Sequence, residues 1–231
     1  MDADEFVYQK QPLCEELTYA PTAPGYLALP VRERAYLSEQ TSLFDGAFRV
    51  PFYGRDAMLA PLYGELSPFL THGVSGHSAG KSCVPVGRDL KFSIHAPRTN
   101  DGKRLPPLHS ASSVLLHFDG LTRLHWIVKM LRYAVGGPKG LVGPHRVAQL
   151  AFMEDGCQGF SEIAEFHDML KALDPEQDAR MSALGLVEHL PFDIGDAART
   201  AIAVAGLSLD AAAFDQELNA RNQDLLSAFR D

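Results

Sequence analysis

The sequence has no long apolar run, no excess of basic residues and no closely spaced cysteines. No window reaches about 18 consecutive apolar residues, the length that a membrane-spanning helix needs. Lys and Arg number 21 against 29 Asp and Glu, a formal net charge of −8, which argues against a surface that binds nucleic-acid phosphates. Cys14, Cys83 and Cys157 lie far apart and lack CxxC spacing, which indicates reduced thiols and not a disulfide framework or a zinc site.

The first residues, MDADEF, have neither the basic segment nor the apolar core that is typical of a signal peptide. The 231 residues are 46% hydrophobic, which is enough for one sizeable core or for one domain with a substantial appendage. We therefore expect a cytoplasmic protein.

Residues 113–134 are the most informative stretch of the chain. A short apolar run at residues 114–116 predicts a buried strand, and His117, Asp119 and Gly120 follow at its carboxyl end. Open α/β sheets bind ligands at this kind of strand-to-helix turn. The turn is therefore a predicted functional site.

An amphipathic helix is expected after this turn. Asp119 or Thr122 can cap it, and the GGP sequence at residues 136–138 ends it. Its apolar residues fall on one helical face, at positions 124, 127, 128, 131 and 135. Further helices are expected at residues 160–173, 176–190, 194–204 and 210–229. We predict that residues 138–231 form a helical appendage that packs on the sheet or on a protein partner.

The first half of the chain predicts strands joined by loops. Residues 26–31 and 48–52 are strand candidates, and the Pro-, Gly- and aromatic-rich residues 51–75 are expected to be mainly loops. Residues 83–86 and 91–95 resemble a hairpin or an adjacent pair of strands. The expected fold class is α/β, with a mixed sheet, helices and a helical C-terminal region.

Gly80-Lys81-Ser82 invites a P-loop interpretation, which the surrounding residues do not support. The P-loop pattern needs a glycine where this chain has Ser75, and Pro85 opposes the helix that must follow. A nucleoside triphosphatase is therefore only a third hypothesis. Lys81 can still meet a phosphate as a point charge, and the alternative is a solvated lysine.

Asp2 and Asp4 form a D-x-D triplet. In an extended segment their side chains point the same way, so both can bind one divalent cation. The alternative is an ordinary frayed and acidic terminus.

Taken in order, these motifs resemble the catalytic domain of family-2-like bacterial glycosyltransferases, which have the GT-A fold and use a nucleotide-sugar donor. The likeness is carried by the D-x-D-E-F segment, the G-x-x-x-G-K-S turn at residues 76–82, a strand ending in His-x-Pro and a late strand ending in His. It implies that Asp2 and Asp4 hold Mn²⁺ or Mg²⁺ at the donor diphosphate. It also implies that His117 completes the metal shell.

The turn after His117 is similar to a second motif, the H-x-x-G-x-x-K-P-W of glycogenin-type enzymes. Gly120 has the same spacing from His117, and Arg123 stands at the lysine position. Leu124 and His125 replace the Pro-Trp pair, so the likeness does not extend to a retaining mechanism. It implies that Gly120 and Arg123 contact the donor phosphates.

The sequence offers two candidate carboxylates for the catalytic base and does not decide between them. An inverting transfer needs a carboxylate near the acceptor hydroxyl, and Glu33 and Asp119 are the candidates. The alternative for Glu33 is a surface ion pair with Arg32 or Arg34, and for Asp119 a helix cap. His77 and His95 are candidates for the acceptor site or for supporting the metal ligands, with a structural hydrogen bond as their alternative.

The resemblance covers about residues 2–134, so residues 1–137 are predicted to be the C-terminal half of a GT-A-like domain. We expect Met1 to be an internal methionine of a longer parent, and the chain alone to have little or no transferase activity. The predicted function is metal-dependent transfer of a sugar from a nucleotide-sugar donor to a glycan or surface polysaccharide. A non-catalytic binding or assembly module, with the C-terminal helices as its partner interface, is the alternative.

Overall fold

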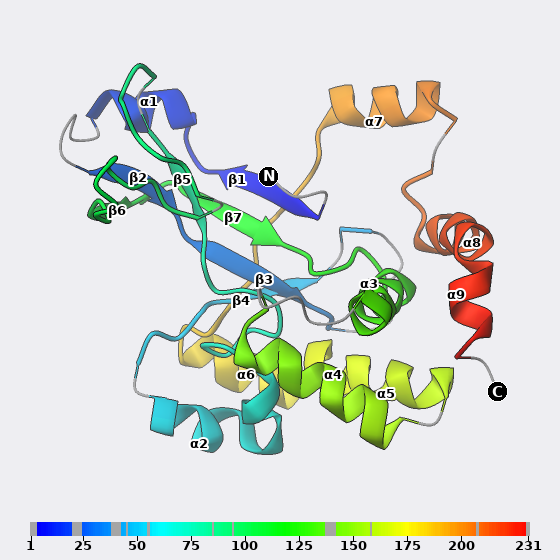
Figure 1. The fold of residues 1–231 in the computed structure, drawn as a ribbon. Coiled ribbons are helices and arrows are strands. Elements are labelled where there is room, and N and C mark those ends of the chain that lie inside the picture. Colours follow the sequence, from blue (N-terminus) through cyan, green and yellow to red (C-terminus); the bar gives the residue numbers. More distant parts are fainter. Residues whose placement is uncertain are drawn as a thin grey trace. The chain divides into compact units, whose positions relative to one another are not determined.

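The computed structural model describes residues 4–19, 25–37, 43–44, 46–54, 56–84, 86–93, 95–136, 142–157, 159–206 and 208–229. The chain divides into two compact units (Figure 1). Unit 1 comprises Met1–Arg32 and Ser78–His117, and unit 2 comprises Glu33–His77 and Phe118–Asp231. The combination of helices and sheets confirms the predicted α/β class.

Unit 1 is built mainly of strands. Its elements are β1 (Glu5–Gln9), α1 (Leu13–Tyr19), β2 (Tyr26–Leu29), β5 (Lys81–Cys83), β6 (Pro107–His109) and β7 (Ser113–His117). β1 and β7 pair antiparallel, with Glu5 opposite His117. β2 pairs antiparallel with β5 and parallel with β6. Leu29, Val31 and Leu115 form the buried core of this unit.

Unit 2 combines a short antiparallel ladder with most of the helices. β3 (Val31–Ala35) enters it at Glu33 and pairs with β4 (Ala47–Arg49), which pairs with β8 (Val187–Glu188). The segment after β4 holds η1 (Asp56–Met58), α2 (Leu59–Tyr63) and η2 (Gly64–Phe69). The remaining helices are α3 (Arg123–Gly136), α4 (Pro144–Gly156), α5 (Phe160–Lys171), α6 (Pro175–Ala183), α7 (Asp196–Val204), α8 (Ala211–Arg221) and α9 (Gln223–Ser227).

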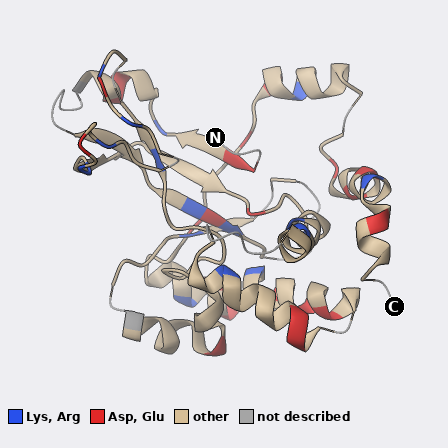
Figure 2. Ribbon diagram, viewed as in Figure 1, with Lys and Arg blue, Asp and Glu red and all other residues tan. Residues whose placement is uncertain are grey.

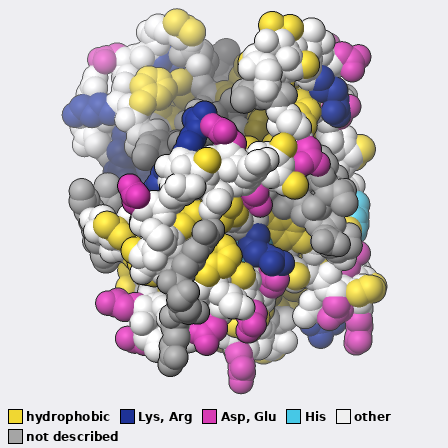
Figure 3. Space-filling model, turned by 90° about the vertical axis from the view of Figure 1, so that its right-hand side faces the viewer, with side chains coloured by type: hydrophobic (Ala, Val, Ile, Leu, Met, Phe, Trp, Pro, Cys, Tyr) yellow, Lys and Arg dark blue, Asp and Glu magenta, His cyan; other side chains and the backbone are white. Residues whose placement is uncertain are grey.

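The main core of unit 2 lies where α3 packs against α4, α5, α8 and α9 (Figure 1). Trp126, Ile127 and Leu131 of α3 and Phe166 and Leu170 of α5 are almost completely buried. On the face drawn in Figure 3, acidic and basic side chains are interspersed with hydrophobic ones. Within the described ranges, no helix combines the length and the apolar character needed to cross a membrane.

Several predicted elements are confirmed. β7 coincides with the predicted buried strand, and α3 and α5 match the first two amphipathic helices. Thr122 is the residue that caps α3, because its hydroxyl oxygen accepts from the backbone N–H of His125 at 3.1 Å. α7 also matches its prediction.

The hairpin predicted at residues 83–86 and 91–95 is wrong. β5 pairs with β2 instead, and Lys91 forms an isolated bridge with Arg98. The expectation of loops at residues 51–75 is also wrong for α2 and the two 3-10 segments. Pro61 and Pro68 suggested loops, but proline is tolerated where a helical turn is too short to need its N–H.

Two of the predicted C-terminal helices are too long, and neither α1 nor α4 was predicted. α6 ends at Ala183 because Gly185 takes a left-handed φ of 69°, and β8 follows it. The helix predicted at residues 210–229 divides at Asn222 into α8 and α9. α4 was missed. The boundary at residue 137, between the GT-A-like part and the helical appendage, stays a prediction. The compact units instead divide the chain after residues 32, 77 and 117.

Candidate functional site

Asp4 and His117, two of the predicted metal ligands, lie side by side in unit 1. The β1–β7 register places Glu5 opposite His117, and Asp4 directly precedes that pair. A carboxylate oxygen of Asp4 lies within 4.8 Å of an imidazole nitrogen of His117. The two residues are only 7% and 2% exposed, so the acidic segment is not frayed from Asp4 onward. Asp2 lies outside the described residues.

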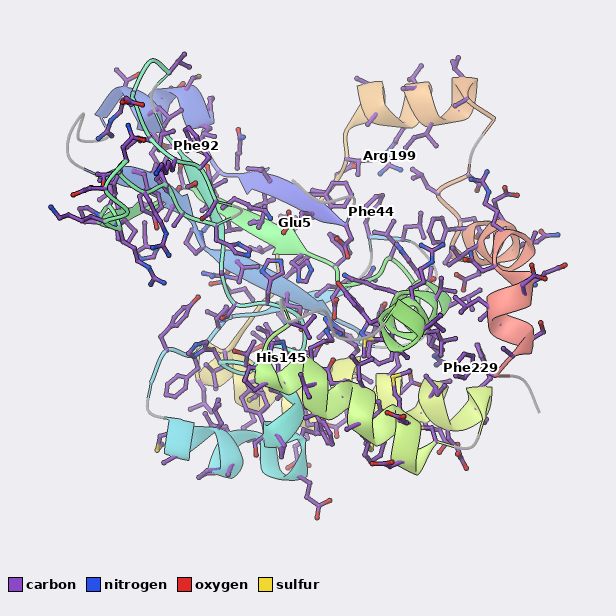
Figure 4. All side chains as sticks on the ribbon, viewed as in Figure 1. Glu5, Phe44, Phe92, His145, Arg199 and Phe229 are labelled. Carbon is purple, nitrogen blue, oxygen red and sulfur yellow. The ribbon has the colours of Figure 1, made fainter. Side chains whose placement is uncertain are left out.

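Lys81, a predicted phosphate contact, is paired with an acidic residue of β1. Its Nζ lies 3.1 Å from Oε2 of Glu5, whose side chain is fully buried (Glu5 is labelled in Figure 4). Lys81 begins strand β5 and not a helix, which confirms that Gly80-Lys81-Ser82 is not a P-loop. Because Glu5 already compensates its charge, a phosphate would compete with this carboxylate for Lys81.

His95 and His77 belong to different units. In unit 1, His95 Nδ1 lies 3.1 Å from the carbonyl oxygen of Gly80, which fits the structural alternative. His77 is half-buried and ends the first segment of unit 2. Roles for these histidines in an acceptor site stay predictions.

Glu33, a predicted catalytic carboxylate, is completely buried on β3. Its Oε1 accepts from the backbone N–H of Ser75 at 2.7 Å and from the Ser75 hydroxyl at 2.9 Å. Its Oε2 accepts from the N–H of Gly76 at 2.6 Å, and Lys171 Nζ lies 3.2 Å from Oε1. The alternative of a surface ion pair is therefore wrong, and the carboxylate holds the turn at residues 75–76.

Asp119, the second predicted catalytic carboxylate, is also fully buried and contacts three cationic side chains. Its Oδ1 accepts from Lys129 Nζ and from Arg146 Nη2, both at 3.0 Å. Lys171 Nζ lies 3.4 Å from Oδ2, so one ammonium group bridges Glu33 and Asp119. These contacts favour a positioning role for both carboxylates over proton transfer, because each donor stabilises the ionised form. The catalytic roles stay predictions.

The sequence did not single out the cations of this network. Arg146, near the start of α4, also donates to Gln149 Oε1 at 2.8 Å, and the Gln149 amide donates to the carbonyl oxygens of Phe69 and Ser75. Lys171, the last residue of α5, is 1% exposed. Single basic residues on amphipathic helices usually face solvent, so the pattern gave no signal for their burial.

Arg34 holds the turn that follows β7. Its Nη2 donates to the carbonyl oxygens of Gly120 at 2.8 Å and Leu121 at 2.9 Å, and its Nη1 donates to that of Leu43 at 2.6 Å. The guanidinium carbon lies 4.6 Å from the ring centroid of Phe118. Figure 2 shows acidic and basic positions side by side on β3. Charged residues inside a strand were the one sequence signal that could have indicated this buried network.

Comparisons with known proteins bear on which family the chain belongs to. No family model, curated protein or solved structure matches it. The residues and their geometry, together with the likeness of the motifs, therefore carry the functional argument.

Unit 2 also contains a cavity of about 830 Å³, lined by residues of α3, α5 and α8 and by the chain after β3. Arg123, a predicted phosphate contact, lines it, and its Nη2 lies 2.7 Å from Oδ2 of Asp168. The hydroxyl of Thr122 donates to Oδ1 of Asp215. Burial raises the pKa of Asp215, and the hydrogen bond from Thr122 partly offsets this.

His167 lies in the wall of this cavity and is 1% exposed. Its Nδ1 lies 3.0 Å from Oδ1 of Asp168, and its ring packs against Tyr36 and Trp126. Burial lowers the pKa of His167 below its usual value of 6.5, and the charge of Lys171 acts in the same direction. The hydrogen bond that His167 donates to the Asp168 carboxylate opposes the shift. The neutral imidazole is therefore the form that the folded chain favours.

We expect the free energy of unfolding to fall as the pH decreases through about 6.5. A depressed pKa in the folded state means that the unfolded chain binds more protons in this window. The stability that neutral His167 contributes is thus complete above the pKa of His167 in the unfolded chain. It is lost as the pH falls from there to the lower pKa of His167 in the folded chain. Urea unfolding between about pH 5 and pH 8 should show a shallower slope for His167→Asn than for the wild type. His109→Asn, at an exposed histidine, is the control, and equal slopes in all three proteins would contradict the assignment.

Proposed function

We propose that this chain is a metal-dependent glycosyltransferase, or part of one, that transfers a sugar from a nucleotide-sugar donor to a glycan. The observation that carries the proposal is the meeting of Asp4 and His117 on the paired strands β1 and β7. These residues come from opposite ends of the motif pattern that resembles the GT-A enzymes. A location in the cytoplasm is part of the proposal, and the free thiols of Cys14, Cys83 and Cys157 support it.

The donor set fits a divalent cation. Asp4 offers a carboxylate oxygen and His117 an imidazole nitrogen, which suit Mn²⁺, while Mg²⁺ relies more on oxygen ligands and water. Asp4 and His117 would hold the ion, together with Asp2 as the motif implies. When bound, the ion neutralises charge that develops on the diphosphate leaving group.

The other residues of the proposal act through their contacts. Lys81 pairs with the carboxylate of Glu5, so a donor phosphate would compete with Glu5 for its ammonium group. Arg123 pairs with Asp168 and lines the cavity of unit 2, and its predicted contact with the donor phosphates is not part of this proposal. The backbone φ of Asp119 is 48°, in the left-handed region, and the three cations around its carboxylate hold the turn in this conformation.

Removal of the metal ligands tests the proposal by calorimetry. Mn²⁺ with UDP or GDP is titrated into the purified wild-type chain and into Asp4→Ala, His117→Ala and His109→Ala. We expect the affinity for Mn²⁺ to fall by more than about a hundredfold in the first two variants, because even residues that only support metal ligands contribute 10–100-fold.

His109→Ala is the matched control, because His109 is an exposed histidine of the same unit. This variant should bind Mn²⁺ like the wild type. Circular dichroism checks that each variant is folded. If the folded wild type binds neither metal nor nucleotide, or if His117→Ala binds both unchanged, the chain is better described as a non-catalytic binding or assembly module.

A further inference from the structure

We propose that the cavity of unit 2 binds an uncharged saccharide, namely the end of the acceptor glycan. The acceptor role rests on the proposed glycosyltransferase function, whereas saccharide binding can be tested without it. The polar side chains in the wall are Tyr36, Thr122, Arg123, His167, Asp168, Asp215 and Asn219. The volume of about 830 Å³ lies within the range of sites that enclose small organic ligands.

The charge of the lining argues against a phosphate. Among the described residues that line the cavity, Arg123 is the one cationic side chain, and its charge is compensated by the ion pair with Asp168. Asp215 adds a second carboxylate, and His167 is neutral because burial disfavours its charged form. The described part of the wall therefore offers a phosphate no cation whose charge is not already compensated, which leaves a neutral ligand as the better occupant.

The polar groups suit a ligand with several hydroxyls. A carboxylate has about four acceptor positions, and Thr122 occupies one of those of Asp215. Asn219 lies one helical turn from Asp215 on α8, so both side chains line the same wall. The hydroxyl oxygen of Tyr36 accepts from Arg34 at 2.7 Å and therefore has its own O–H to donate. Hydroxyl groups, which both donate and accept, match this mixture of acceptors and donors.

The apolar part of the lining provides a surface for the C–H groups of a sugar ring. Leu124, Phe160 and Leu173 contribute larger side chains. Ala211 and Ala212 lie on the same helix as Asp215, and their small side chains leave room beside its carboxylate. A saccharide presents both C–H faces and hydroxyl edges, so it complements this wall better than a purely apolar ligand does.

A matched pair of variants tests the proposal. Ala212 and Ala213 are consecutive exposed residues of α8, and Ala212 lines the cavity while Ala213 is not among its lining residues. Ala212→Trp should fill the cavity without removing a hydrogen bond, and Ala213→Trp adds the same side chain outside it. Saturation-transfer NMR measures binding of the methyl glycosides of glucose, galactose and mannose to the full chain. Mn²⁺ with UDP is titrated into the same samples.

We expect at least one glycoside to give a signal with the wild type and with Ala213→Trp, and the signal to be lost in Ala212→Trp. Asp215→Asn is the second variant, because its amide oxygen still accepts from Thr122 while the carboxylate is gone, and it should weaken the same signal. No signal with the wild type, or equal signals in all variants, would overturn the proposal. Loss of nucleotide binding in Ala212→Trp alone would also overturn it, because the cavity would then belong to the donor.

The two proposals fail separately in this experiment. If glycosides bind in the expected pattern but no variant binds Mn²⁺ with UDP, the saccharide cavity stands and the transferase function fails. If nucleotide binding is intact and the glycosides do not bind, the saccharide cavity fails and the transferase function stands.

Discussion

Replacing Asp119 with asparagine is expected to lower the free energy of unfolding by about 3–5 kcal/mol. The substitution leaves the buried Arg146 and the partly exposed Lys129 facing a neutral amide, while Lys171 keeps its second partner, Glu33. Uncompensated buried cations are strongly destabilising, because the protein interior solvates charge poorly. Asparagine also tolerates the left-handed φ of 48° at this position, so the loss reports charge and not backbone strain. Urea unfolding at neutral pH measures it.

An exposed ion pair provides the control for this prediction. Asp193 lies 2.5 Å from Arg199, and their side chains are 60% and 50% exposed. Asp193→Asn should therefore leave the midpoint of urea unfolding almost unchanged, because an exposed ion pair is screened by solvent.

The double variant Asp119→Asn with Lys171→Met should be less destabilised than the sum of the two single variants, because it removes a cation together with its partner. Similar small losses in Asp119→Asn and Asp193→Asn, or strict additivity of the double variant, would show that the buried network is not coupled.

Gly120→Ala is expected to cost on the order of 3 kcal/mol of unfolding free energy. Gly120 has a φ of 107°, which side chains rarely adopt, and an added Cβ would meet the backbone N of Trp126 at 2.8 Å and its Cα at 2.9 Å. The backbone at the start of α3 cannot retreat, because Trp126 is buried in the core of unit 2.

Gly185→Ala separates the two contributions. Gly185 also has a positive φ, of 69°, but an added Cβ meets nothing within 4 Å. It should cost only about 1 kcal/mol, which measures backbone strain without a clash. Equal losses in the two variants would contradict the close packing of the turn against α3. Because this packing by itself requires glycine, loss of activity in Gly120→Ala would not demonstrate phosphate binding.

The α/β class, β7, α3 and the three further helices α5, α7 and α8 follow from local patterns in the sequence. Apolar residues with strand or helix spacing decide these elements, because their burial contributes most of the stabilisation in either case. The D-x-D-E-F segment and the late histidine were also visible as motifs. The side-by-side position of Asp4 and His117 then follows once β1 pairs with β7.

Only the tertiary structure decided which residues surround those motifs. Nothing local in the sequence connects Lys81 with Glu5, or Asp119 with Arg146 and Lys171. Each of these pairs brings together residues that are far apart in the chain, and a buried charge selects its partner by space and not by sequence distance.

Contacts between distant segments also explain why β5 pairs with β2 and does not form the predicted hairpin. For the same reason, the cavity of unit 2 could not be predicted from local patterns. Its wall collects Tyr36, Arg123, His167 and Asp215 from four different parts of the chain. Local spacing determined the helices and strands of this protein, whereas the packing of distant segments decided its buried charges and its cavity.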